Sequence, residues 1–187
     1  MEHGHNTTIR GNVPRGAGAL VLYLDFDGVL HHENCLWHPR RGAYLDAPEG
    51  HVLFQHADLL AQVLEPYPQW KIVLSTSWVR TYSCFGAAKR LPVSLRERVI
   101  GATFHSEMNE SGFQSLPRGL QVCNDVERRK PRKWIALDDD ASGWPMWSIG
   151  HFIQTDQVLG ITNAWVLNRL KVDLEMMTKD ANQDANK

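Results

Sequence analysis

Residues 20–34, with the sequence LVLYLDFDGVLHHEN, contain the feature that decides the fold. Five apolar or aromatic residues come first, and the chain then turns polar at Asp25-Phe26-Asp27-Gly28. A short apolar run without alternation is typical of a strand that is buried on both faces, as in a parallel sheet covered by helices. The two carboxylates at its end belong either to a solvated turn or to a functional site.

Segments with strand and helix patterns alternate along the rest of the chain. We expect strands at residues 20–24, 71–75, 98–104, 133–137 and 151–155, and helices at residues 51–64, 119–129 and 162–177. Strands that alternate with helices predict an α/β fold, a three-layer Rossmann-like parallel sheet with helices on both faces.

Length and composition are those of one globular domain. The 187 residues are 43% hydrophobic and 22% charged, and no apolar run is long enough for a transmembrane helix. We expect a flexible lead-in at residues 1–17, a single domain at 18–177 and a polar tail at 178–187 that frays. The formal charge of −1 argues against membrane binding and against strong nonspecific binding to nucleic acid. It leaves the oligomeric state open.

The cysteines and the N-terminus bear on location. Cys35, Cys84 and Cys123 are few and widely spaced, which favours a reducing compartment over a disulfide framework. The first residues lack the apolar segment of a signal peptide. A cytoplasmic location is therefore expected.

Polar residues directly follow three of the expected strands. They are Asp25 and Asp27; Ser75, Thr76 and Ser77; and Asp138, Asp139 and Asp140. In a parallel sheet ligands bind beyond the carboxyl ends of the strands, so these side chains are expected to converge. Aspartates are also common in turns, where their side chains hydrogen-bond to nearby backbone. That explanation suffices for one aspartate cluster but is less convincing for two clusters at the ends of different strands. Close carboxylates repel unless a hard cation binds them, and Mg²⁺ is the usual ion beside phosphate.

Three motifs in this order resemble those of a known superfamily. YLDFDGVL resembles the first motif of the haloacid dehalogenase-like (HAD) hydrolases, IVLSTSWVR the second and WIALDDDASGWP the fourth. The forms LSTSW and ALDDD are similar to the HAD domains associated with Swiss Army Knife RNA repair proteins. The resemblance covers about residues 20–174. It implies a HAD-like fold and a Mg²⁺-dependent phosphatase, a phosphoric monoester hydrolase that forms an aspartyl-phosphate.

The resemblance also implies a role for each motif residue. Asp25 would be the nucleophile, and Asp27 the general acid and then the general base. Gly28 would allow a tight turn and close approach of the substrate. Ser75 is the better match to the phosphate-binding hydroxyl of the second motif, with Thr76 as the alternative.

The metal ligands and the phosphate-balancing cation follow in the same way. Asp25, Asp138 and Asp139, with the backbone carbonyl of Asp27, would bind Mg²⁺. Arg118 is the first candidate for the third-motif cation, and Arg80 could also reach the phosphate. The alternative is a basic run, which we expect at a helix end away from the site: Arg128, Arg129, Lys130, Arg132 and Lys133.

Two further features lie close to the motifs. His31 and His32 follow the first motif, and adjacent loop histidines are expected to be exposed to solvent. Trp78 follows the second motif and is expected to pack beneath a loop.

The segments at residues 28–70 and 77–118 are too short for a large cap domain, and the first should hold a loop and one helix. An uncapped site favours a macromolecular phosphorylated substrate, such as a nucleic-acid end. A small-molecule phosphatase and a non-catalytic HAD-fold binding module are the alternatives.

Overall fold

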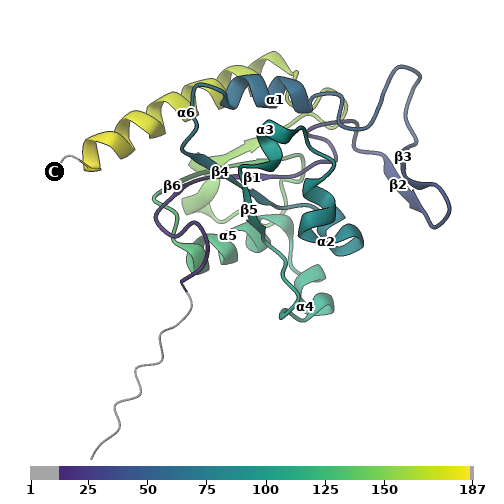
Figure 1. The fold of residues 1–187 in the computed structure, drawn as a ribbon, viewed down its shortest axis with the longest axis horizontal. Helices are drawn as coiled ribbons and strands as arrows, with labels where there is room; N and C mark the ends of the chain where they lie inside the picture. The colour runs from purple at the N-terminus through teal and green to yellow at the C-terminus, as the bar shows by residue number, and fades with distance from the viewer. Residues whose placement is uncertain (1–12, 186–187) are drawn as a thin grey trace, which may run out of the picture.

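The buried run at residues 20–24 forms the central strand of the sheet in the computed structural model, which describes residues 13–185. This strand, β1, pairs in parallel with β4 on one side and β6 on the other. The strand order is β5-β4-β1-β6-β7 (Figure 1). The bounds are β1 Leu20–Leu24, β4 Trp70–Leu74, β5 Val99–Ala102, β6 Lys133–Asp138 and β7 Phe152–Gln154. The predicted parallel α/β sheet is therefore confirmed.

Helices cover both faces of this sheet, and the alternation of side chains along β1 decides which face meets which helix. Leu22 and Leu24 pack with α1, α2, α3 and α6, whereas Val21 and Tyr23 pack against α5. In Figure 1, α1 and α6 lie above the sheet and α5 lies below it. The bounds are α1 Ala57–Leu64, α2 Trp78–Ala88, α3 Val93–Arg96, α4 Glu110–Gln114, α5 Arg118–Arg129 and α6 Ala164–Ala185, with a 3₁₀ turn, η1, at Met146–His151. The three-layer prediction is confirmed, and residues 13–185 contain no large cap domain.

The segment between β1 and β4 differs from the prediction of a loop and one helix. It also contains a two-stranded antiparallel hairpin, β2 (Cys35–His38) and β3 (Gly42–Leu45), which projects from the body of the domain (Figure 1). Its strands are short, and none of their residues is fully buried, so they lack the apolar pattern used to find strands. Helix α1 begins at Ala57 rather than near residue 51, because Phe54 has a left-handed φ of 60° and interrupts the helical pattern.

The end of the described chain also corrects a prediction. Helix α6 continues to Ala185, so the tail that was expected to fray beyond residue 177 is helical up to there. Ala181 is fully buried, and the Trp70 indole donates to Thr178 Oγ1 at 2.9 Å. The segment is polar, but it lacks proline and glycine and keeps one face against the core, which is sufficient for a helix.

The other end of the domain contacts the far end of α5. Residues 1–12 of the expected lead-in lie outside the described residues. The Arg129 guanidinium donates to the carbonyl of Arg15, and the Gly18 N–H donates to the carbonyl of Lys130 at 3.0 Å.

No helix among residues 13–185 combines the length and apolar character needed to cross a bilayer.

The buried face of the last turns of α6 gives a stability prediction. We expect a chain that ends after Met177 to lose about 1–3 kcal/mol of unfolding free energy, because the Trp70 indole loses its acceptor and Ala181 its packing. Denaturant unfolding measures the loss. A chain that ends after Gln183 is the matched control, because Asp184 and Ala185 are exposed. Equal stability of the two truncated chains would show that this segment does not pack as described.

Candidate active site

The register of the central strands brings the motif residues together. Leu24 of β1 pairs with Leu74 of β4 and with Leu137 of β6. The next residue of each strand is Asp25, Ser75 or Asp138. Backbone hydrogen bonds continue this alignment, from Asp25 N–H to the carbonyl of Leu137 at 3.1 Å and from Ser75 N–H to the carbonyl of Leu24 at 2.8 Å. Three motifs far apart in sequence therefore meet at one sheet edge.

Three carboxylates form an acidic cluster at this edge. Asp25, Asp138 and Asp139 each offer an oxygen, and these oxygens lie within 4.8 Å of one another. Asp25 is 3% exposed and Asp138 only 1%. Burial raises the pKa of Asp25 to about 7, and the charge of Asp27 adds to the effect while Arg118 opposes it. Burial and the charge of Asp25 also raise the pKa of Asp138 well above its usual value.

Arg118, the first residue of α5, offsets part of this negative charge. Its Nη2 lies 3.3 Å from Asp25 Oδ2, and its Nε lies 3.2 Å from Asp138 Oδ2. Burial opposes the positive charge, but the surrounding carboxylates outweigh it and raise the pKa of Arg118. The side chain therefore stays cationic between the two aspartates.

Close backbone packing fixes the start of α5 and so positions Arg118. Gly119 donates its N–H to the carbonyl of Ser142 at 2.9 Å. A Cβ on Gly119 would lie 2.5 Å from the nitrogen of Trp144, so only glycine fits there without movement. The loop that follows the fourth motif thus packs directly on the helix that begins with Arg118.

Two buried polar atoms in the cluster make no hydrogen bond within the described residues. They are Ser75 Oγ and Asp138 Oδ2; the Arg118 Nε–H is near the latter but is not aligned for a hydrogen bond. Burying such atoms without partners costs free energy, so a ligand is the expected partner. Oxygen donors with excess negative charge suit a hard cation, so the cluster fits Mg²⁺.

Gly28 lies between the first motif and the fourth. It has a φ of +65°, and a Cβ there would lie 2.5 Å from Cγ of Asp139. Its carbonyl accepts a hydrogen bond from Thr155 Oγ1 at 2.7 Å. Glycine therefore allows the tight turn, as expected, and is also needed for the approach of Asp139 to the cluster, while the approach of substrate stays a prediction.

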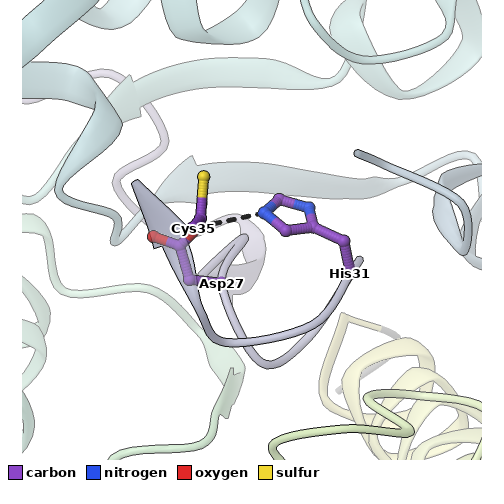
Figure 2. A group of neighbouring side chains, drawn as sticks. All are labelled: Asp27, His31 and Cys35. Atoms are coloured by element: carbon purple, nitrogen blue, oxygen red, sulfur yellow. Dashed lines mark hydrogen bonds and ion pairs between the residues drawn. The ribbon is translucent and has the colours of Figure 1, made fainter. Parts of the chain in front are cut away.

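Asp27 lies outside the acidic cluster and has different neighbours. Its side chain is 24% exposed, and Oδ1 lies 2.9 Å from Nε2 of His31. Figure 2 shows Asp27, His31 and Cys35 facing one another. Burial, followed by the charge of Asp27, raises the pKa of the Cys35 thiol to about 12, so the thiol stays protonated. The Trp78 indole donates to both oxygens of Asp27, at 2.9 and 3.2 Å.

A cavity of about 330 Å³ opens beside the cluster. Thr76, Ser77, Arg80, Arg118 and Asp140 are among the residues that line it. A smaller cavity of about 60 Å³ also includes Ser77 in its wall and lies between α2 and the β2–β3 hairpin, with Asp27 in its lining. A phosphate group of a few ångströms fits the larger cavity with two guanidinium groups around it.

The comparisons with known proteins agree with this geometry. Residues 21–166 match the family described as the HAD domain in Swiss Army Knife RNA repair proteins. The chain belongs to this family. Neither the search of curated proteins nor the search of solved structures found a match.

Within this HAD domain, the structure brings most of the predicted site residues together. Asp25, Ser75, Asp138 and Asp139 meet at the cluster, as described above, and Arg118 contacts it. Thr76 and Arg80 line the larger cavity, and Arg80 Nη1 lies 4.0 Å from Glu110 Oε1.

The alternative basic run lies apart from the cluster. Arg128 and Arg129 are in the last turn of α5 and bond to Asp125 of the same helix, at the end opposite Arg118. Their guanidinium groups are therefore engaged by a buried carboxylate, which disfavours them as phosphate ligands for this site.

The two histidines after the first motif, and the contacts of Trp78, differ from expectation in this HAD domain. His31 and His32 are 0% and 6% exposed, so the prediction of solvent-exposed loop histidines is wrong. The loop after the first motif folds back on the domain and is covered by the segment that contains His56. The His56 N–H donates to the carbonyl of Leu30 in this loop at 2.9 Å. Trp78 packs beneath the loop as expected, but its hydrogen bonds to Asp27 were not anticipated. In the sequence, the available signal for the contact between Asp27 and His31 was their spacing of four residues.

The acidic cluster of the HAD domain gives a prediction on metal and pH. A carboxyl whose pKa is raised on folding binds its proton more tightly when folded, so its stabilising contribution is present at low pH and is lost as the pH rises through about 7. Mg²⁺ replaces that proton, so its stabilising effect should grow over the same range, to about 2.7 kcal/mol at a concentration 100-fold above its dissociation constant.

Thermal unfolding with and without Mg²⁺, at one pH below and one above 7, measures this effect. Asp138→Asn should remove most of the metal-dependent shift, whereas Asp58→Asn, an exposed change on α1, should keep it. A shift of equal size at both pH values, or one retained in Asp138→Asn, would contradict the assignment of the cluster as a metal site.

Proposed function

We propose that this HAD domain is a Mg²⁺-dependent phosphatase that hydrolyses phosphate monoesters through a phosphorylated Asp25. The observation that carries the proposal is the alignment of Asp25, Ser75 and Asp138 at adjacent strand ends, with Arg118 beside the two carboxylates. It combines a nucleophile, a hydroxyl donor and a cation at one edge of the sheet, beside the larger cavity that Arg118 lines.

Asp25 supplies the nucleophile for the first step. One carboxylate oxygen bonds to phosphorus while the bond from phosphorus to the leaving oxygen breaks. The carboxylate is oriented for this attack, because Oδ1 accepts the N–H of Phe26 at 2.7 Å and Oδ2 lies 3.3 Å from Arg118 Nη2. The unpartnered hydroxyl of Ser75 is available to donate to a phosphoryl oxygen.

Asp27 serves both steps as a proton carrier. It gives a proton to the leaving oxygen in the first step and takes one from the attacking water in the second, which releases phosphate and restores Asp25. Its side chain lines the smaller cavity next to Ser77, where a leaving group can lie beside the phosphate site.

The metal requirement follows from the acidic cluster. Asp25, Asp138 and Asp139 would hold the ion, with the backbone carbonyl of Asp27 as the further ligand that the family implies. When bound, Mg²⁺ supplies positive charge that keeps Asp25 ionised and offsets the charge of the phosphate.

Removal of the nucleophile tests the mechanism. Asp25→Asn should lower Mg²⁺-dependent hydrolysis of an aryl phosphate by roughly 10³-fold or more, because the amide does not form the phosphoenzyme. Phosphate release measures the rate, and Asp58→Asn on the exposed face of α1 is the control for folding and expression. Equal turnover by Asp25→Asn and the wild type would overturn Asp25 as nucleophile and leave the fold as a binding module.

For the substrate, we propose a phosphorylated nucleic-acid end. Residues 13–185 place no cap domain over the site, so a long substrate can approach it. Trp37 of the hairpin is 53% exposed and lines the smaller cavity together with Asp27, where it can stack on a base. Arg40 and Arg41 are exposed at the hairpin turn and can pair with backbone phosphates. The family description names RNA repair proteins, which supports the same substrate class.

A substrate panel with a hairpin variant tests this assignment. We expect higher kcat/KM for 5′- or 3′-phosphorylated RNA oligonucleotides than for mononucleotides and sugar phosphates. Trp37→Ala should weaken the oligonucleotide transition-state complex by about 1–3 kcal/mol and leave aryl phosphate turnover unchanged. Trp147→Ala, with a tryptophan of similar exposure on η1, is the matched control. Preference for sugar phosphates or free nucleotides would instead favour a small-molecule phosphatase.

A further inference from the structure

The group around Asp27 has a geometry that the family motifs do not account for. Asp27, His31 and Cys35 each present one atom, and these atoms lie within 4.8 Å of one another (Figure 2). Asp27 and His31 belong to the loop after β1, and Cys35 opens β2. Three side chains of metal-binding type so close together could form either a second metal site or a hydrogen-bonded support for Asp27.

The backbone around His31 decides between these two. The N–H of Phe54 lies 3.3 Å from Nδ1 of His31 and donates to it, so Nδ1 carries a lone pair. In the neutral ring the proton then lies on Nε2, which donates to Asp27 Oδ1 at 2.9 Å. A metal on Nε2 would require the proton on Nδ1, directed at the N–H of Phe54. The arrangement therefore favours a hydrogen-bond donor over a metal ligand.

Trp78 supplies a second donor to the same carboxylate. Its Nε1–H lies 2.9 Å from Oδ1 and 3.2 Å from Oδ2 of Asp27. Among the hydrogen bonds within residues 13–185, Oδ1 thus accepts from both His31 and Trp78, whereas Oδ2 accepts only the longer one from the indole. Of the two oxygens, Oδ2 is the one with capacity left for a proton.

Aromatic packing holds both donors in place. His31 is 0% exposed and Trp78 is 4% exposed. The ring of Phe54 meets both of them edge-on, with centroids 4.9 Å from His31 and 5.1 Å from Trp78. Neither donor can rotate away from Asp27 without displacing Phe54.

The backbone of Phe54 provides an independent observation. Its φ of 60° lies in the left-handed region, which is unfavourable for a bulky residue. The same residue contributes the N–H that fixes the His31 tautomer and the ring that packs on both donors. Strain at this position is consistent with a local structure kept for function rather than for stability.

We propose that His31 and Trp78 are positioning residues that fix Asp27 so that Oδ2 carries the transferred proton. This rests on the proposed phosphatase activity. In the first step the Oδ2–H proton passes to the leaving oxygen as its bond to phosphorus breaks. In the second, Oδ2 takes a proton from water as the water oxygen bonds to phosphorus and the bond from phosphorus to Asp25 breaks. Oδ1 keeps its hydrogen bonds throughout.

The leaving group of the substrate separates this role from a structural one. An alkyl phosphate needs its leaving oxygen protonated, whereas a dinitrophenyl phosphate has a leaving group that departs as a stable anion. His31→Phe and Trp78→Phe should therefore lower kcat for the alkyl ester by about 10²-fold. They should change the rate constant of the phosphorylation step with the dinitrophenyl ester, measured as the burst of released phenol, by less than about threefold. His31→Gln, which can return a donor to Asp27, should recover much of the alkyl activity.

Controls keep folding and activity apart. His32→Gln changes a neighbour that is also buried and whose Nδ1 accepts from Asn34 N–H, and it should leave both rates unchanged. Melting temperatures identify variants that fail to fold, and Trp78→Phe then carries the test if His31→Phe does so. A loss in the phosphorylation rate of the dinitrophenyl ester as large as the loss for the alkyl ester, or no loss on the alkyl ester, would overturn the positioning role.

A spectroscopic measurement tests the support without turnover. Nitrogen-15 NMR of the wild-type imidazoles should show His31 as the Nε2–H tautomer, with the Trp78 indole N–H shifted when Asp27 is changed to Asn. An Nδ1–H tautomer would overturn the proposal even in an active enzyme. If the wild type hydrolyses neither ester while the tautomer is as expected, the proposed phosphatase function fails and the hydrogen-bonded support stands.

Discussion

Parallel pairing of β1 with both β4 and β6 is the constraint on which the site depends. Because the last residues of the three strands are in register, the first polar residue after each strand enters the same small volume. Asp25 and Asp138 are thereby buried side by side, although burial and mutual repulsion disfavour the charged form of both carboxylates. The apolar core on both faces of β1 supplies the free energy that holds them there. The fold therefore places these negative charges close together, and the remaining features of the site offset them.

Within the chain, Arg118 offsets part of this negative charge. Its position depends on contacts away from the cluster. The guanidinium reaches Asp25 and Asp138 because α5 begins where the loop after β6 packs on Gly119. One guanidinium still leaves Asp138 Oδ2 without a hydrogen bond and the pKa of Asp25 at about 7. The residual charge would make a bound cation favourable, so the proposed affinity for metal and the cost of burying the carboxylates have one origin.

How far the sequence could predict this site differs from residue to residue. Asp25, Ser75 and Asp138 were predictable because each directly follows an apolar run, and a parallel sheet aligns such ends. Arg118 was accessible through its expected place at a helix start. His31, by contrast, lies in a loop without periodicity, and its burial depends on Phe54, whose left-handed φ no pattern indicated. The helical continuation of α6 to Ala185 depends on one buried alanine and one indole hydrogen bond, which a polar composition conceals.

The two aspartates of the first motif are two residues apart and have opposite surroundings. Asp25 is buried among other carboxylates and a guanidinium, where its charge is costly and a cation or a phosphorus atom relieves the cost. Asp27 is partly exposed, faces a cavity and receives neutral N–H donors from His31 and Trp78. A group that must bond to phosphorus benefits from fixed charges around it, and a group that must exchange a proton benefits from contact with the leaving group and with water. In the proposed mechanism, these different environments, more than the shared residue type, separate the nucleophile from the proton carrier.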